Sequence, residues 1–317
     1  MRTKEKNFVS ATVYLYNAAR EAEQLGRMLV RTLEENFEHS EIIFVNDHST
    51  DDSAEAVKRV SSIAHTTSIS LLNMSYFQGR EAAMNAGLDL AIGDFVFEFD
   101  TTYVDYTDKD IMAVYDQALE GFDMVSASPD RKMRRTSRLF YQMLDRFSDT
   151  PYSMTSERFR ILSRRVINRV MSMNNDIPYR KAVYSHCGLK TRNMVYQAVS
   201  DKGGRTEGRR IGHAEKRYRR NLGIDVLLLF TGVGYRFSIG MTVAMILVTV
   251  FMIFYSLVIY LFGNPVEGWT TTILFFSFAF FGLFGLLTVV IKYLQILVDL
   301  VFKRKRYSFE SLEKLTR

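Results

Sequence analysis

The chain of 317 residues is 47% apolar and 24% charged, a balance that excludes disordered and fibrous proteins. Its single cysteine, Cys187, excludes a disulfide framework and any cysteine-based metal cluster. The 41 basic and 35 acidic side chains are unevenly distributed: the net charge is −12 over residues 1–129 and +15 over residues 130–236, and few charges follow before residue 303. The chain therefore has an acidic front, a basic middle and a nearly uncharged rear.

The acidic front alternates apolar, β-rich runs with helix-like stretches. The expected strands cover residues 8–16, 41–47, 68–74 and 94–100, and the expected helices cover residues 18–36, 53–64, 79–91 and 111–121. This alternation predicts an α/β fold whose mostly parallel sheet is covered by helices on both faces. In such folds, ligands bind at the carboxyl ends of the strands.

Polar residues stand where three of the expected strands end. Asn17 ends the first run, Asp47 ends the second and Asp100 ends the fourth. Taken singly, each aspartate suits a helix cap as well as a ligand contact. The three residues together, with the polar cluster at residues 46–51, predict a binding site at this edge of the sheet.

The basic middle holds three groups of arginines and lysines. They are Arg131, Arg134, Arg135 and Arg138; Arg158, Arg160, Arg164 and Arg165; and Arg209, Arg210, Lys216, Arg217, Arg219 and Arg220. Guanidinium groups match phosphate oxygens bidentately, so one hypothesis is that they bind phosphates. The other hypothesis, for the third group above all, is attraction to anionic lipid headgroups. Nucleic acid is not an expected partner, because the chain contains no recognisable nucleic-acid-binding module.

The rear of the chain contains two runs without a charged residue, at 237–266 and 268–291. About 20 apolar residues span a bilayer as a helix, so both runs predict transmembrane helices. Basic residues flank the pair on both outer sides, which places the front and the tail in the cytoplasm. Two short spans beside one large domain also favour a homo-oligomer. The predicted domains are a cytoplasmic domain at 1–208, a basic amphipathic juxtamembrane segment at 209–236, two transmembrane helices at 237–302 and a basic cytoplasmic tail at 303–317.

Several motifs follow one another in a recognisable order. They are Tyr16-Asn17, the block Val45-Asn46-Asp47-His48-Ser49-Thr50-Asp51-Asp52-Ser53, Gly79-Arg80, Asn85-Ala86-Gly87, Ala91-Ile92-Gly93-Asp94, and the stretch from Phe159 to Val166. Together with the basic segment before the membrane and the two spans, they resemble family 2 glycosyltransferases of the GT-A fold. The branch that they resemble is the polyprenyl-phosphate sugar transferases, which include dolichol-phosphate mannose synthase-like enzymes and bactoprenol glucosyltransferases.

The resemblance implies a membrane enzyme with a Rossmann-like GT-A domain. It would transfer a sugar from a UDP- or GDP-sugar to a polyprenyl phosphate at the cytoplasmic face of the inner membrane, for a cell-envelope glycan. The donor would lie across the strand ends, with its base at Asp47 and its ribose or diphosphate at Asp100. The implied donor-binding residues are Tyr16, Asn17, Asp47, Ser49, Gly79, Arg80, Asp100 and Thr102.

The resemblance also implies roles for the basic residues. The implied catalytic residues are Asp100, Arg131 and Arg160, and the implied lipid-phosphate contacts are Arg134, Arg160, Arg209, Lys216 and Arg217. Arg160 is thus expected to touch both the reacting groups and the lipid.

The sequence departs from the family at the metal motif. The family's Asp-x-Asp holds Mg²⁺ or Mn²⁺ on the donor diphosphate. Here it reads Asp100-Thr101-Thr102, so Asp100 is left as the metal ligand, and Ala18 replaces an acidic residue of the first loop. These departures count against a metal cofactor and leave three hypotheses open. In the first, arginines neutralise the diphosphate in place of the metal. In the second, the chain uses another lipid-linked acceptor. In the third, it is a non-catalytic scaffold or regulator on the same fold.

Overall fold

A computed structural model describes residues 3–130, 157–172, 180, 183–184, 188–199, 217–218, 221, 268–302 and 307–316, together with a few residues between 240 and 254. The chain divides into two compact units. The first, which we call the sheet domain, holds all the described strands and the helices α1, α2, α3, α4 and α6. The second holds the long helix α10.

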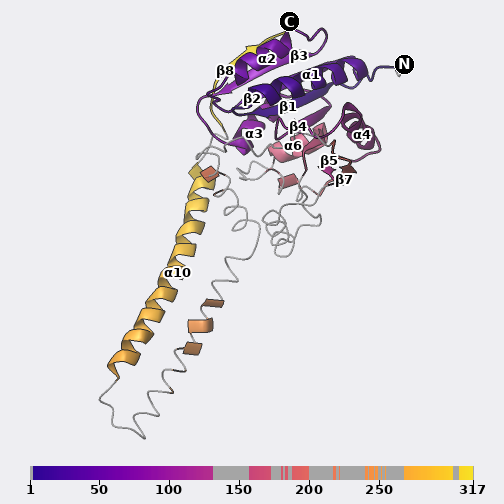
Figure 1. The fold of residues 1–317 in the computed structure, drawn as a ribbon. Coiled ribbons are helices and arrows are strands. Elements are labelled where there is room, and N and C mark those ends of the chain that lie inside the picture. Colours follow the sequence, from indigo (N-terminus) through magenta and orange to yellow (C-terminus); the bar gives the residue numbers. More distant parts are fainter. Residues whose placement is uncertain are drawn as a thin grey trace. The chain divides into compact units, whose positions relative to one another are not determined.

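The sheet domain is built on one eight-stranded sheet in the order β7-β5-β6-β4-β1-β2-β3-β8 (Figure 1). The strands are β1 (Val9–Leu15), β2 (Ser40–Asn46), β3 (Ser68–Met74), β4 (Phe95–Phe99), β5 (Met124–Pro129), β6 (Phe159–Ser163), β7 (Thr191–Tyr196) and β8 (Phe309–Lys314). Strands β1 to β4 are mutually parallel, as is the pair β5 and β7, whereas β6 and β8 run antiparallel to their neighbours. The predicted α/β fold with a mostly parallel sheet is confirmed.

Helices cover both faces of this sheet and form two hydrophobic cores. Helices α1 (Ala19–Asn36), α2 (Ser53–Ser61) and α4 (Asp108–Leu119) contribute to one core, and α3 (Arg80–Leu90) and α6 (Arg164–Ser172) contribute to the other. In α1 the buried residues Ala22, Leu25, Leu29 and Leu33 recur every three or four positions, which gives the helix one apolar stripe. That stripe packs on the sheet and leaves the charged side of α1 in solvent.

The C-terminal segment contributes a strand that the sequence did not predict. Within the predicted basic tail at 303–317, β8 pairs antiparallel with β3, from Lys314 opposite Ser70 to Phe309 opposite Met74. Most of its side chains are exposed, so it lacks the apolar alternation that marks a half-buried strand. Hydrogen bonds hold it instead, for example from the Ile69 amide to the Thr316 hydroxyl at 2.6 Å.

The second unit contains α10, which runs from Trp269 to Phe302. Phenylalanines follow one another along it at four-residue spacing, with the ring centroids of Phe276 and Phe280 and those of Phe280 and Phe284 6.4 Å apart. In the part of the chain that the structure describes, no helix has both the length and the apolar character needed to cross a membrane.

Candidate functional site

The candidate site lies at the carboxyl ends of β1, β2 and β4. Strand β1 pairs with β2 on one side and with β4 on the other, while β3 continues beyond β2. The strand order therefore reverses at β1, and such a switch point leaves room for a ligand outside the strand ends. As predicted, the three polar residues stand at the ends of these strands: Asp47 and Asp100 directly follow β2 and β4, and Asn17 stands two residues after β1. Hydrogen bonds join the loop after β1 to the loop after β2.

The loops after β1 and β2 are tied to each other by side chains. The backbone N–H of Asn17 donates to the Ser49 hydroxyl at 3.0 Å, and the side-chain oxygen of Asn17 accepts from the backbone N–H of Thr50 at 2.7 Å. The Ser53 hydroxyl accepts from the Ala18 amide and also contacts Asp51. Asn17 and Ser49 therefore shape the site's rim, and their predicted contact with a donor stays a prediction.

His48 adopts a backbone conformation that normally favours glycine. Its φ of 58° lies in the left-handed region, where a side chain costs roughly 1 kcal/mol or more. We expect His48→Gly to raise the thermal midpoint of unfolding by about 2–4 °C, the shift that about 1 kcal/mol gives in a domain of this size. The control is His65→Gly, because His65 has a negative φ. An unchanged midpoint for His48→Gly, or an equal rise in both variants, would contradict the assignment of strain.

Asp47 is completely buried at the end of β2. One carboxylate oxygen accepts from the Tyr14 hydroxyl at 3.0 Å and from the Gly79 amide at 2.9 Å, and the other accepts from the Gln78 amide at 2.8 Å. Burial raises the pKa of the Asp47 carboxyl, and the hydrogen bonds from Gln78, Tyr14 and Gly79 oppose that rise. Asp47 thus fixes the loop that leads into α3, and its predicted contact with the donor base stays a prediction.

Aromatic rings surround the start of α3. Gly79, with a φ of 90°, lies so close under the Tyr218 ring that a Cβ there would stand 2.2 Å from it. The Tyr218 hydroxyl accepts from the Glu81 amide at 3.2 Å. The Phe77 ring lies between Tyr16, at 4.7 Å between centroids, and Tyr218, at 6.0 Å. Two of the predicted donor-binding residues, Tyr16 and Gly79, are therefore linked through the rings of Phe77 and Tyr218, and a third, Arg80, directly follows Gly79.

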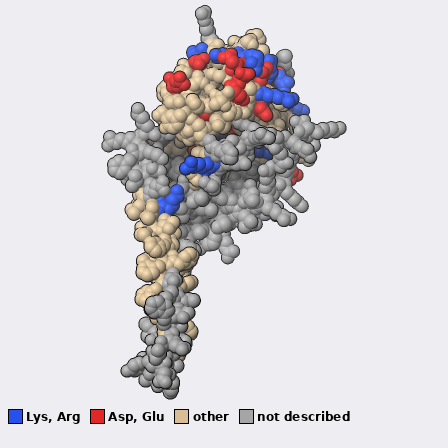
Figure 2. All heavy atoms as spheres, turned by 60° about the vertical axis from the view of Figure 1, so that its left-hand side comes forward, with Lys and Arg blue, Asp and Glu red and all other residues tan. Residues whose placement is uncertain are grey.

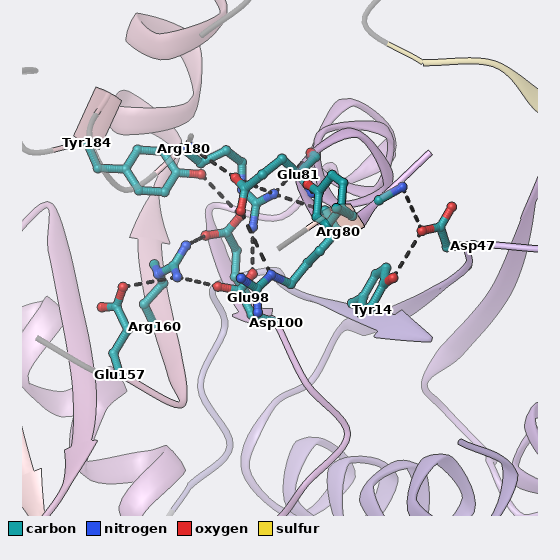
Figure 3. Close-up of polar contacts among 12 residues, drawn as sticks. Tyr14, Asp47, Arg80, Glu81, Glu98, Asp100, Glu157, Arg160, Arg180 and Tyr184 are labelled. Carbon is teal, nitrogen blue, oxygen red and sulfur yellow. Dashed lines mark hydrogen bonds and ion pairs between the residues drawn. The ribbon is translucent and has the colours of Figure 1, made fainter. Parts of the chain in front are cut away.

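Carboxylates and guanidinium groups alternate in a closed ring at the carboxyl end of β4 (Figure 3). Glu98 of β4 stands opposite Arg160 of β6 in the strand register. Glu98 contacts Arg160 at 2.6 Å and Arg180 at 3.2 Å, and Asp100 contacts the same two guanidinium groups at 2.5 Å each. We call Glu98, Asp100, Arg160 and Arg180 the arginine–carboxylate ring. Two guanidinium groups and two carboxylates alternate around it.

Further groups hold the arginine–carboxylate ring from outside. Glu157 contacts Arg160 at 3.0 Å, and the Tyr184 hydroxyl donates to Glu98 at 3.1 Å. The Arg160 side chain is only 1% exposed. Burial by itself lowers the pKa of Arg160, but the charges of Asp100, Glu157 and Glu98 outweigh it and hold the pKa above its ordinary value. Burial likewise lowers the pKa of Arg180, and the charges of Glu81, Glu98 and Asp100 outweigh it, so both ring arginines stay charged.

The surroundings of Asp100 do not fit the metal ion that the family motif implies. Each carboxylate oxygen of Asp100 already lies 2.5 Å from a guanidinium nitrogen, so a cation would have to displace an arginine. Thr102 is buried and offers a hydroxyl, whereas Mg²⁺ is usually held by carboxylates and substrate phosphates. Among the described residues, no group of three His, Cys, Asp or Glu side chains could hold a metal.

The structure describes some of the predicted site residues and not others. Asp100 and Arg160 are in contact, and Arg217 is exposed. Arg131, Arg134, Arg209 and Lys216 lie outside the described residues. Sequence reasoning missed Glu98 and Arg180; a lone glutamate in the apolar run 95–99 was a signal for the first, and no signal marked the second.

This chain is similar to several known proteins. The model of glycosyl transferase family 2 matches residues 10–172. The bactoprenol glucosyl transferase of Shigella phage SfV is 28% identical over 252 residues, which are 76% of this chain and 78% of the relative. The uncharacterized glycosyltransferase YkcC of Bacillus subtilis is 24% identical over 204 residues, which are 62% of either chain, so less than two thirds of that relative is matched.

A solved structure is also similar to this chain. The mannosyltransferase PcManGT from Pyrobaculum calidifontis, in complex with GDP-Man and Mn²⁺, has a TM-score of 0.44 and 19% identity, over 63% of this chain and 59% of that chain.

Proposed function

The chain belongs to glycosyl transferase family 2, and we propose that it transfers a sugar from a UDP- or GDP-sugar to a polyprenyl phosphate. The observation that carries the proposal is the arrangement at the switch point of the sheet. Asp47, the aromatic pair Tyr16 and Phe77, and Arg80 all stand around the start of α3. An aromatic face, a carboxylate and a guanidinium are the groups that a base and a diphosphate need. The similarity to bactoprenol glucosyl transferases supports a polyprenyl phosphate as the acceptor.

The proposed reaction needs no strong general base. An acceptor phosphate is already an anion, so its oxygen forms the new bond to the anomeric carbon of the sugar while the bond to the nucleoside diphosphate breaks. The protein has to align the two substrates and neutralise the diphosphate that leaves. Arg80, whose side chain is 34% exposed, and Arg158, whose side chain is 30% exposed, are two described arginines near the strand ends that solvent reaches.

The proposal places the sheet domain and both termini at the cytoplasmic side of a membrane. Residues 237–266 and 268–291 carry no charge, and basic residues stand on both outer flanks. Large apolar side chains of α10 are exposed, among them Phe281 and Phe284, and the described surface of α10 is almost without charge in Figure 2. A lipid environment would cover such a surface. The proposal keeps the domain boundaries expected from the sequence, with the cytoplasmic domain at 1–208 and the spans at 237–302.

A second candidate function is a non-catalytic scaffold or regulator on the same fold. It is favoured by the surroundings of Asp100, whose two oxygens are both held by arginines, and by Thr102 in place of the second metal carboxylate. Such a protein would bind a nucleotide sugar without transferring the sugar.

A lipid-extraction assay distinguishes the two functions. The purified full-length protein in detergent receives a short polyprenyl phosphate and labelled UDP- and GDP-sugars, one at a time. The proposed transferase moves label from one donor into the organic phase. Absence of label with every donor, in a protein that still binds a nucleotide, would support the scaffold instead.

We predict that this transfer survives chelation of divalent cations. The two guanidinium groups on Asp100 stand where a cation would bind, so removing cations takes nothing from the site. The expected rate in EDTA lies within about twofold of the rate in Mn²⁺, and EDTA saturated with Mg²⁺ serves as the control for other effects of the chelator. Complete loss of transfer in EDTA, restored by Mn²⁺, would show that a cation is required.

A further inference from the structure

We propose that Gln78 is a positioning residue through which the C-terminal segment, residues 307–316, holds the donor-binding loop in place. The loop in question is the β3–α3 loop, residues 75–79. The inference rests on the proposed function, because it concerns the affinity for the nucleotide-sugar donor. It adds to that function a role for a segment that follows α10 and lies more than two hundred residues further along the chain.

The side-chain amide of Gln78 makes two hydrogen bonds to the backbone of Ser308. Its nitrogen donates to the Ser308 carbonyl, and its oxygen accepts from the Ser308 amide at 2.9 Å. The Ser75 amide also donates to the Ser308 carbonyl at 3.3 Å. The side-chain amide of Gln78 therefore continues the hydrogen bonding between β3 and β8 beyond the last paired residues of the two strands.

The backbone of the same residue is bound to the candidate donor site. The backbone N–H of Gln78 donates to one carboxylate oxygen of Asp47 at 2.8 Å, and the backbone N–H of Gly79 donates to the other oxygen at 2.9 Å. The ring of the preceding residue, Phe77, packs against the ring of Tyr16. Gln78 thus joins the C-terminal segment on one side to Asp47 and the aromatic pair on the other.

The opposite end of β8 is attached to the sheet without reaching the donor site. Because the two strands are antiparallel, Thr316 lies at the start of β3, where its hydroxyl accepts from the Ile69 amide. Between the two ends, the Asn73 side chain donates to Ser311 and Glu313 at 3.0 Å each. The chain therefore offers a matched pair: Gln78 and Thr316 both bind the C-terminal segment, and only Gln78 lies in the loop that contacts Asp47.

The test compares Gln78→Met with Thr316→Val in the full-length protein. Methionine keeps the length of the side chain and the backbone contact to Asp47, and it removes both contacts to Ser308. Valine removes the hydroxyl at the far end of β8. We expect Gln78→Met to raise the KM for the donor about tenfold and to leave kcat within about twofold, because two hydrogen bonds that order the loop are lost. We expect Thr316→Val to lower the melting temperature without changing that KM.

Two kinetic results would overturn the proposal. One is an unchanged donor KM in Gln78→Met, and the other is an equal rise of KM in both variants, which would mean that Gln78 only stabilises β8. Hydrogen exchange at residues 76–80 gives a readout that does not depend on transfer. Faster exchange there in Gln78→Met than in Thr316→Val supports the positioning role, and equal exchange rejects it. A wild-type protein that transfers no sugar would contradict the proposed function, while the exchange rates would still decide this inference.

Discussion

Replacing Arg160 by methionine is expected to lower the free energy of unfolding of the sheet domain by about 3–5 kcal/mol, the usual cost of removing one partner from a buried ion pair. Arg160 contacts Glu98, Asp100 and Glu157, and the side chain of Glu98 is fully buried. Without Arg160, Glu98 and Asp100 keep only the other arginine of the ring, Arg180, and Glu157 loses its contact with Arg160. The buried charge of Glu98 is then left with one arginine partner instead of two. The measurement is urea unfolding of the full-length protein, followed by circular dichroism.

Two further variants show whether the effect comes from the ring. Arg165→Met removes the pair with Asp123, in which the arginine side chain is 67% exposed, so it should cost at most about 1 kcal/mol. The double variant Glu98→Met with Arg160→Met leaves Asp100 paired with Arg180, and it should recover part of the loss. Equal losses in Arg160→Met and Arg165→Met would show that the ring does not stabilise the fold.

Replacing Asp47 by alanine is expected to weaken nucleotide binding by about 1–3 kcal/mol, which corresponds to about 5–150-fold in the dissociation constant. The change removes the acceptor of the Gln78 and Gly79 amides and of the Tyr14 hydroxyl, so the start of α3 loses its anchor. It also removes the carboxylate proposed to face the base. The measurement is calorimetric titration of the wild type and the variant with the nucleotide of the active donor.

Asp94→Ala is the matched control for this prediction. Asp94 lies before β4, at the edge of the sheet opposite the candidate site, and it accepts from the Phe8 amide at 3.0 Å. Its removal should leave nucleotide affinity unchanged. Unchanged affinity in Asp47→Ala as well would remove Asp47 from the binding site.

The front of the fold could be predicted from the sequence because each element carries its own local signal. The apolar runs at 41–47 and 68–74 lie within one residue of β2 and β3, and the helix predicted at 18–36 lies within one residue of α1. Local pattern is sufficient there, since buried parallel strands are continuously apolar and the helices between them are amphipathic. The position of Asp47 and Asp100 at strand ends followed from the same boundaries.

The partners of these residues could not be predicted in the same way. Arg180 reaches Glu98 and Asp100 across 82 and 80 positions of the chain, and no local pattern marks an arginine for such a contact. The strand β8 is exposed and has no apolar alternation, so only its pairing with β3 reveals it. Asp47 illustrates the consequence: its place at a strand end was predictable, but its three hydrogen-bond donors were not.

The most direct test of the central claim, that the strand ends of this sheet bind a nucleoside diphosphate, is a calorimetric titration. UDP and GDP are added separately to the full-length wild-type protein in EDTA. We predict saturable binding of one of the two at a single site without any added cation. Binding of neither nucleotide, in a protein shown to be folded by its circular dichroism, would contradict the claim.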